Sequence, residues 1–257
     1  MTRIAGKLAL ITGASSGIGR ACARRFAADG CHVVLWARRR DRLEELATEL
    51  RAAHGITVEV AAVDVRSRAA VTAAADALAA AGRVPDILLN GAGLAAGLAK
   101  IHEGNPDDWD RMLDTNVKGL LNVTRAILPR MVARNRGHVV NLGSIAGEQV
   151  YPMGNVYNAS KFAVRALTLG TAIDLTGTNI RVCSIDPGLV ETEFSVVRFG
   201  GDADRAKAVY QGFTPLTADD IAELVGFVVN LPEHVNVQEM SVFPTAQRSA
   251  RDLFRTP

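Results

Sequence analysis

One short stretch near the start of the sequence restricts the fold more than any other feature. Residues 8–11 (LALI) form a continuous apolar run typical of a buried strand, and a glycine-containing turn, residues 12–19, follows directly. Residues 20–28 then have apolar side chains at helical spacing, with basic residues between them. Strand, glycine turn and helix are the parts of the first unit of a doubly wound α/β sheet, in which the helix N-terminus faces a phosphate group.

Strand and helix patterns alternate along the rest of the 257-residue chain, without a repeat or a linker. Apolar runs predict further strands at 32–37, 58–62, 86–89, 138–142, 181–185 and 238–243. Helical patterns lie at 41–53, 69–81, 114–134, 157–176 and 217–231, and another helix begins at 105–108. We therefore expect a single α/β domain over residues 1–257, with a Rossmann-type parallel sheet of about seven strands covered by helices on both faces.

Composition excludes several classes of protein. The formal net charge of +2 gives no reason to expect a nucleic-acid or anionic-membrane partner. No apolar run approaches the ~18–20 residues of a membrane span, and no secretory signal pattern is found, so we expect a cytoplasmic protein. The three cysteines have no metal-ligand spacing, fit reduced thiols and predict no metal site.

A tyrosine and a lysine, Tyr157 and Lys161, stand four residues apart in a helical segment and therefore project from the same face. A free phenol has a pKa near ~10, and a neighbouring ammonium group favours the phenolate. Lowering that pKa to about 7 requires about 4 kcal/mol of interaction. The pair is a candidate general acid/base, and Ser144 follows the strand at 138–142, at the sheet edge where ligands bind.

These motifs together resemble the short-chain dehydrogenase/reductase family over essentially the whole chain. The turn reads Thr-Gly-x-x-x-Gly-x-Gly, and residues 90–93 (NGAG) resemble the family's Asn-Asn-Ala-Gly turn, with Gly91 in place of the second asparagine. The resemblance implies reversible hydride transfer between a nicotinamide and an alcohol or carbonyl carbon. It implies a catalytic set of Asn116, Ser144, Tyr157 and Lys161, in which Asn116 holds a water that relays protons to Lys161.

Arginines at the end of the second strand predict the form of the cofactor. An acid about 20 residues after the glycines binds the ribose 2′-hydroxyl of NAD, whereas a basic residue there accepts the 2′-phosphate of NADP. Arg38 and Arg39 occupy this position, so we expect NADP(H). With the residues that the family resemblance implies, the expected cofactor contacts are Gly13, Ser15, Ser16, Gly17, Ile18, Gly19, Arg38, Arg39, Asp64, Val65, Asn90, Gly91, Ala92, Tyr157, Lys161, Pro187, Gly188, Val190 and Thr192.

The substrate is indicated by a narrower resemblance. Residues 154–157, 187–199 with Gly201 and Asp202, and 231–237 resemble the NADP-dependent 3-hydroxy acid dehydrogenases, including the serine 3-dehydrogenase type. We expect a substrate lid at about 190–215, with Arg198 binding the substrate carboxylate and Ser144 and Tyr157 at the reacting oxygen. The family resemblance also implies a homotetramer.

The sequence leaves three alternatives open. Residues 13–17 fit the G-x-S-x-G turn of hydrolases, although no histidine stands in a supporting pattern. A cofactor-binding regulator of the same fold need not keep Ser144, Tyr157 and Lys161 together. A broad-specificity ketone or aldehyde reductase of the same family is the third.

Overall fold

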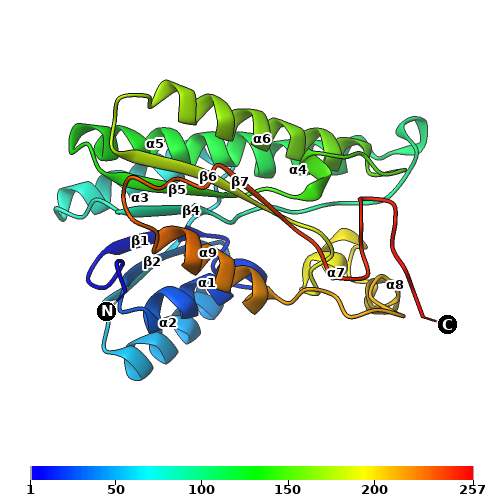
Figure 1. The fold of residues 1–257 in the computed structure, drawn as a ribbon, viewed down its shortest axis with the longest axis horizontal. Coiled ribbons are helices and arrows are strands. Elements are labelled where there is room, and N and C mark those ends of the chain that lie inside the picture. The colour runs from blue at the N-terminus through cyan, green and yellow to red at the C-terminus, as the bar shows by residue number, and fades with distance from the viewer. Residues whose placement is uncertain (1, 257) are drawn as a thin grey trace.

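The computed structural model describes residues 2–256 and contains the expected doubly wound sheet (Figure 1). All seven strands are parallel, in the order β3-β2-β1-β4-β5-β6-β7, so the direction of winding reverses between β1 and β4. The strands are β1 (Leu8–Thr12), β2 (His32–Ala37), β3 (Val58–Ala62), β4 (Ile87–Asn90), β5 (Gly137–Leu142), β6 (Ile180–Pro187) and β7 (Glu239–Val242).

Helices cover both faces of the sheet (Figure 1). One face carries α1 (Gly17–Ala28), α2 (Arg40–His54) and α9 (Ala218–Val229). The other carries α3 (Arg68–Ala80), α4 (Pro106–Leu113), α5 (Leu120–Ala133) and α6 (Asn155–Asp174). Two short helices, α7 (Phe194–Arg198) and α8 (Ala203–Ala208), lie beyond the sheet on the side where the chain ends.

The side chains of β1 point alternately to the two faces of the sheet, which explains why helices pack on both faces. Ile11 is fully buried in the same apolar cluster as Phe26 of α1, whereas its neighbour Leu10 is buried in a second cluster with Ile127 of α5. Successive strand side chains point to opposite faces, so a strand that is apolar at every position requires a helix layer on each side.

The helix expected to begin at 114 instead continues from α4. Asn105 caps α4, its side-chain oxygen accepting a hydrogen bond from the Asp107 amide at 3.0 Å, and Pro106 occupies the first turn. The chain then passes through a π-helical segment, Asp114–Gly119, into α5 without leaving helical backbone angles. An isolated π turn within an α-helix is frequently found at a functional site, and this one contains Asn116.

No helix in the described part of the chain, residues 2–256, is both long and apolar enough to cross a bilayer.

Candidate active site

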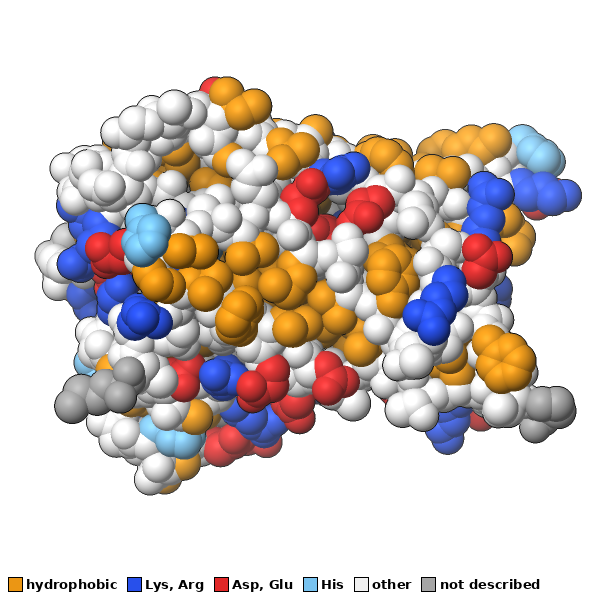
Figure 2. Space-filling model, viewed as in Figure 1, with side chains coloured by type: hydrophobic (Ala, Val, Ile, Leu, Met, Phe, Trp, Pro, Cys, Tyr) orange, Lys and Arg blue, Asp and Glu red, His pale blue; other side chains and the backbone are white. Residues whose placement is uncertain are grey.

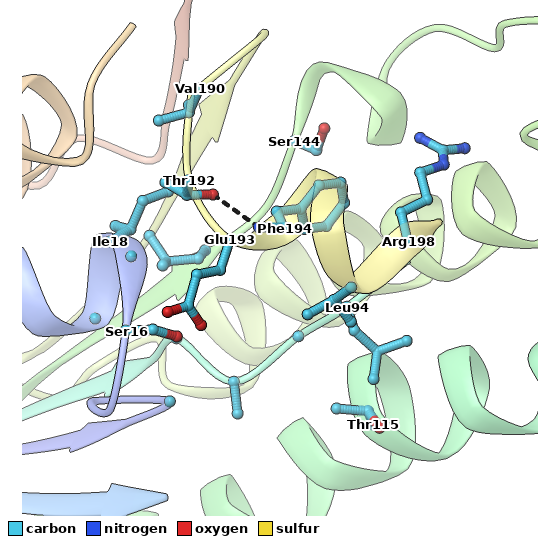
Figure 3. Close-up of a pocket in the computed structure, with 18 of the residues that line it drawn as sticks. Ser16, Ile18, Leu94, Thr115, Ser144, Val190, Thr192, Glu193, Phe194 and Arg198 are labelled. Atoms are coloured by element: carbon cyan, nitrogen blue, oxygen red, sulfur yellow. Dashed lines mark hydrogen bonds between the residues drawn. The ribbon is translucent and has the colours of Figure 1, made fainter. Parts of the chain in front are cut away.

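A cleft of about 510 Å³ opens at the carboxyl ends of the strands, where open parallel sheets bind ligands. Loops that follow β1 through β6 line it, and α7 closes one side (Figure 3). A second hollow, between 212 and 256, is larger at about 1170 Å³, but it contains none of the predicted site residues. We therefore assign the chemistry to the first cleft.

Glycines at two turns let the chain approach itself closely under the cleft. Gly13 has a φ of +70°, and a Cβ there would lie 2.8 Å from the carbonyl oxygen of Gly91. A Cβ on Gly91 would lie 2.7 Å from the carbonyl oxygen of Thr12, so the residue that departs from the family's asparagine has no room for a side chain. The Gly91 and Ala92 amides donate to the Thr12 hydroxyl at 3.0 and 3.1 Å, which ties the β4 turn to β1.

Arg39 projects from the end of β2 onto the glycine turn. Its guanidinium donates to the Ser15 hydroxyl at 3.1 Å and to the Ser16 hydroxyl at 2.7 Å. Arg38 also lines the cleft and is exposed. Asp64, at the end of β3, is paired with Arg66, with nitrogen and oxygen 2.6 Å apart. The first acid after β2, Asp41, lies in the first turn of α2, so arginines and no acid directly follow β2, as predicted.

Tyr157, Lys161 and Ser144 come together in the middle of the cleft. The Lys161 Nζ lies 6.0 Å from the centroid of the Tyr157 ring and donates to the Leu142 carbonyl at 2.8 Å. Ser144 begins a short 3₁₀ turn, and its backbone amide donates to Asp186 at 3.1 Å. Helix α6 therefore presents both side chains on one face, as the i, i+4 spacing predicts.

The expected lowering of the Tyr157 pKa by Lys161 is wrong for this structure. Burial raises the pKa of Tyr157 well above its usual value, the nearby Tyr151 raises it further, and hydrogen bonding with Ser144 lowers it only partly. Burial also lowers the pKa of Lys161 to about 8. Both groups lose water when they enter the same cleft, and this loss is the largest cause of each pKa shift. Tyr157 is thus a protonated phenol at neutral pH.

Two predicted asparagines do not line the cleft. Asn116 is buried, and its side-chain amide both accepts from the Leu94 amide and donates to the Leu94 carbonyl, each at 2.8 Å. It also donates to the Ser160 hydroxyl at 3.0 Å. Asn90 lies below the cleft and donates to Asn141 at 2.9 Å. Both side chains hold the surrounding loops in place.

The other predicted contacts line the cleft. This group consists of Gly13, Gly17, Ile18, Gly19, Val65, Ala92, Pro187, Gly188, Val190 and Thr192, in addition to the residues described above. The Thr192 hydroxyl accepts from the Phe194 amide at 3.2 Å, the bond drawn in Figure 3.

Arg198 of α7 lies among aromatic rings beside the Tyr–Lys pair. Its guanidinium carbon is 5.4 Å from the Tyr151 ring centroid and 5.6 Å from that of Tyr157, and its Nε donates to the Gly97 carbonyl at 3.2 Å. Figure 3 shows it on the Ser144 side of the cleft.

Two residues that sequence reasoning missed complete this part of the cleft. The hydroxyl of Tyr151 is buried without a hydrogen-bond partner among the described residues, and the ring of Phe194 packs edge-on against Tyr157 at 5.5 Å. Tyr151 lies in an irregular segment six residues before Tyr157, so no periodicity distinguishes it.

A glycine turn on a doubly wound sheet, with a buried Tyr–Lys pair in the same cleft, defines an α/β oxidoreductase. The chain belongs to the short chain dehydrogenase family, whose model matches residues 7–199.

Individual relatives match almost the whole chain. It is 47% identical to the NADP-dependent 3-hydroxy acid dehydrogenase YdfG of Salmonella typhi, over 95% of this chain and 97% of that protein. It is 46% identical to sulfoacetaldehyde reductase 2 of Chromohalobacter salexigens, over 93% of this chain and 95% of that protein. The closed form of serine dehydrogenase complexed with NADP+ superposes with a TM-score of 0.91 at 45% identity, covering 95% and 97% of the two chains.

Proposed function

We propose that this enzyme transfers a hydride reversibly between NADP(H) and a small 3-hydroxy acid or serine, the oxidised partner being the 3-oxo acid. The observation that carries the proposal is the position of Arg198, whose guanidinium carbon lies 5.6 Å from the ring of Tyr157 in the cleft. A fixed cation at this distance suits a molecule with an acid group a few bonds from its reacting oxygen. The names of the relatives support the same substrate class and cofactor.

The residues present fit an NADP molecule. The N-terminus of α1 and the glycine turn face the cleft and suit a pyrophosphate, while Ser15, Arg38 and Arg39 suit a 2′-phosphate. Asp64 and Val65 line the same cleft and would contact the adenine ring, as the family resemblance implies. When bound, the nicotinamide supplies or accepts the hydride.

In the reductive direction, the Tyr157 hydroxyl donates its proton to the carbonyl oxygen as that oxygen gains charge. The Ser144 hydroxyl donates a hydrogen bond to the same oxygen and holds it in place. Lys161, cationic below a pH of about 8, stabilises negative charge on Tyr157 after the proton has left. It would also hold the nicotinamide ribose, as the family resemblance implies. A water at the main chain of Asn116, in the π turn, would return the proton through Lys161.

The acid group of the substrate would bind between Arg198 and Tyr151. The Arg198 guanidinium donates one hydrogen bond to the Gly97 carbonyl, and its other N–H groups can bind an anion. The buried Tyr151 hydroxyl can donate to the same anion. Residues 190–215, with α7 and α8, would act as the lid that brings Arg198 to the substrate.

A substrate panel tests the function directly. The purified protein should oxidise 3-hydroxy acids and serine with NADP+, with a lower Michaelis constant for NADP+ than for NAD+. The same panel includes neutral secondary alcohols, sulfonated aldehydes and simple esters. Equal turnover of the neutral secondary alcohols would favour the broad-specificity reductase. Ester cleavage without cofactor would indicate the hydrolase, and cofactor binding without turnover the regulator.

Arg198→Ala should raise the Michaelis constant for 3-hydroxy acids by about 10- to 100-fold, because a charge-assisted hydrogen bond contributes about 1.5–3 kcal/mol. The constant for neutral alcohols should change less than about threefold. Arg205→Ala is the matched control, since Arg205 stacks on Phe199 in the same lid and does not line the cleft. If both substrate classes respond equally to Arg198→Ala, the carboxylate role is wrong.

We also infer a homotetramer in a reducing, cytoplasmic compartment. Figure 2 shows a band of hydrophobic side chains across the face over α9 and β7, where Phe227 is 53% exposed. Leu121 of α5 and Phe162 and Ile173 of α6 are also exposed. Such apolar surface suits contacts between subunits. The three cysteines are free and buried, as expected of reduced thiols.

A further inference from the structure

An ion-pair bridge crosses the cleft between the end of β2 and the start of the lid. Glu193 directly follows Thr192, and its carboxylate accepts from Arg39 at 2.9 Å through one oxygen and from Arg42 at 2.6 Å through the other. In Figure 3 the Glu193 side chain extends from the lid toward Ser16, away from Arg198. Both arginines belong to the β2–α2 segment, so a single acid joins the lid to the basic end of the cleft.

The Arg39 guanidinium, which pairs with Glu193, is also the group best placed to bind a 2′-phosphate. Arg39 contacts the two serines of the glycine turn on one side and Glu193 on the other. The other acid at this end of the cleft, Asp64, already accepts three hydrogen bonds from the Arg66 guanidinium. Glu193 is therefore the anion that a phosphate would meet at Arg39.

We propose that Glu193 is an internal competitor for the 2′-phosphate site, so that it sets how strongly the enzyme binds NADP(H) and how far it prefers NADP(H) to NAD(H). The proposal rests on the cofactor proposed above. A phosphate that approaches Arg39 must displace the carboxylate or bind beside it, and each alternative reduces the affinity for the phosphate. NAD(H), which has a hydroxyl at this position, leaves the bridge intact.

The arrangement also couples the lid to the cofactor. While the bridge is formed, the chain after Thr192 is tied to Arg39 and Arg42. When a phosphate takes Arg39, the Glu193 carboxylate keeps only its bond to Arg42. The cofactor that the enzyme prefers is thus the one that loosens the lid at its first residue.

Fragment binding isolates this effect from catalysis. Glu193→Gln keeps the shape of the side chain and removes its charge, so it should bind 2′,5′-ADP about fivefold more tightly than the wild type. Binding of 5′-AMP, which has no 2′-phosphate, should change less than about twofold. Both affinities are measured by titration calorimetry on the whole protein, and the gain for 2′,5′-ADP should shrink as salt is added.

Glu191→Gln is the control, because it removes the same charge at a position two residues before Glu193. The Glu191 side chain is exposed and, unlike that of Glu193, has no ion pair within residues 2–256. Its affinity for 2′,5′-ADP should stay within about twofold of the wild type. If Glu193→Gln binds 2′,5′-ADP equally or more weakly, Glu193 braces Arg39 instead of competing, and the proposal is overturned. If the wild type itself fails to prefer 2′,5′-ADP to 5′-AMP, the NADP assignment falls as well, so the two failures are distinguishable.

Discussion

Replacing Tyr157 with phenylalanine should lower kcat by about 10³-fold or more in both directions, because general acid–base catalysis contributes about 10²- to 10⁴-fold and no other phenol contacts the reacting oxygen in our proposal. The substitution removes only the hydroxyl. The ring keeps its edge-on contact with Phe194 at 5.5 Å, so the shape of the cleft is preserved.

Stopped-flow hydride transfer with NADPH and a 3-oxo acid measures this loss directly. Tight NADPH binding, followed by the change in nicotinamide fluorescence, and an unchanged melting temperature would show that folding and cofactor binding survive. Turnover near that of the wild type would refute the assignment of Tyr157 as proton donor. The high pKa that burial gives Tyr157 is consistent with a donor that holds its proton until the reaction demands it.

Lys161→Met is expected to have the second largest effect, a loss of about 10²- to 10³-fold in kcat/KM for reduction. Methionine fills the same space without the charge that stabilises Tyr157 after proton transfer. In the wild type, kcat/KM for reduction should fall as the pH rises through about 8, where Lys161 loses its proton. A pH–rate profile of both proteins checks this, and a fall near pH 8 that persists in Lys161→Met would exclude Lys161 as its source.

Stability should respond to the same substitution in the opposite sense from activity. The pKa of Lys161 falls from 10.5 to about 8 on folding, so between these values the unfolded chain binds more protons and the wild type gains stability as pH rises. At pH 7 the buried ammonium costs about 3 kcal/mol, part of which Lys161→Met recovers. Urea unfolding at pH 7 and pH 10 should show a stability difference in the wild type that is smaller in the variant.

Much of the fold followed from local patterns. The strand at 8–11, the glycine turn and the helix after it predicted a doubly wound sheet, and the structure extends β1 to Thr12 and begins α1 at Gly17. The boundary that failed was the helix expected at 114, because an acid and a threonine in sequence resemble a helix start even inside a continuous helix. Capping residues mark a helix start only where the preceding backbone is not helical. Tertiary packing decides whether the backbone before residue 114 is helical.

The sequence by itself determined that Tyr157 and Lys161 lie together: four residues separate them, and helical geometry turns that spacing into a shared face. It also placed arginines, and no acid, at the end of β2. Only the tertiary structure decided the direction of the Tyr157 pKa shift and the position of Arg198 between two aromatic rings. It alone also decided the ion pair between Glu193 and Arg39, which lie 154 positions apart in the sequence. Burial and Coulomb interactions depend on distances through space, and no local pattern encodes those distances.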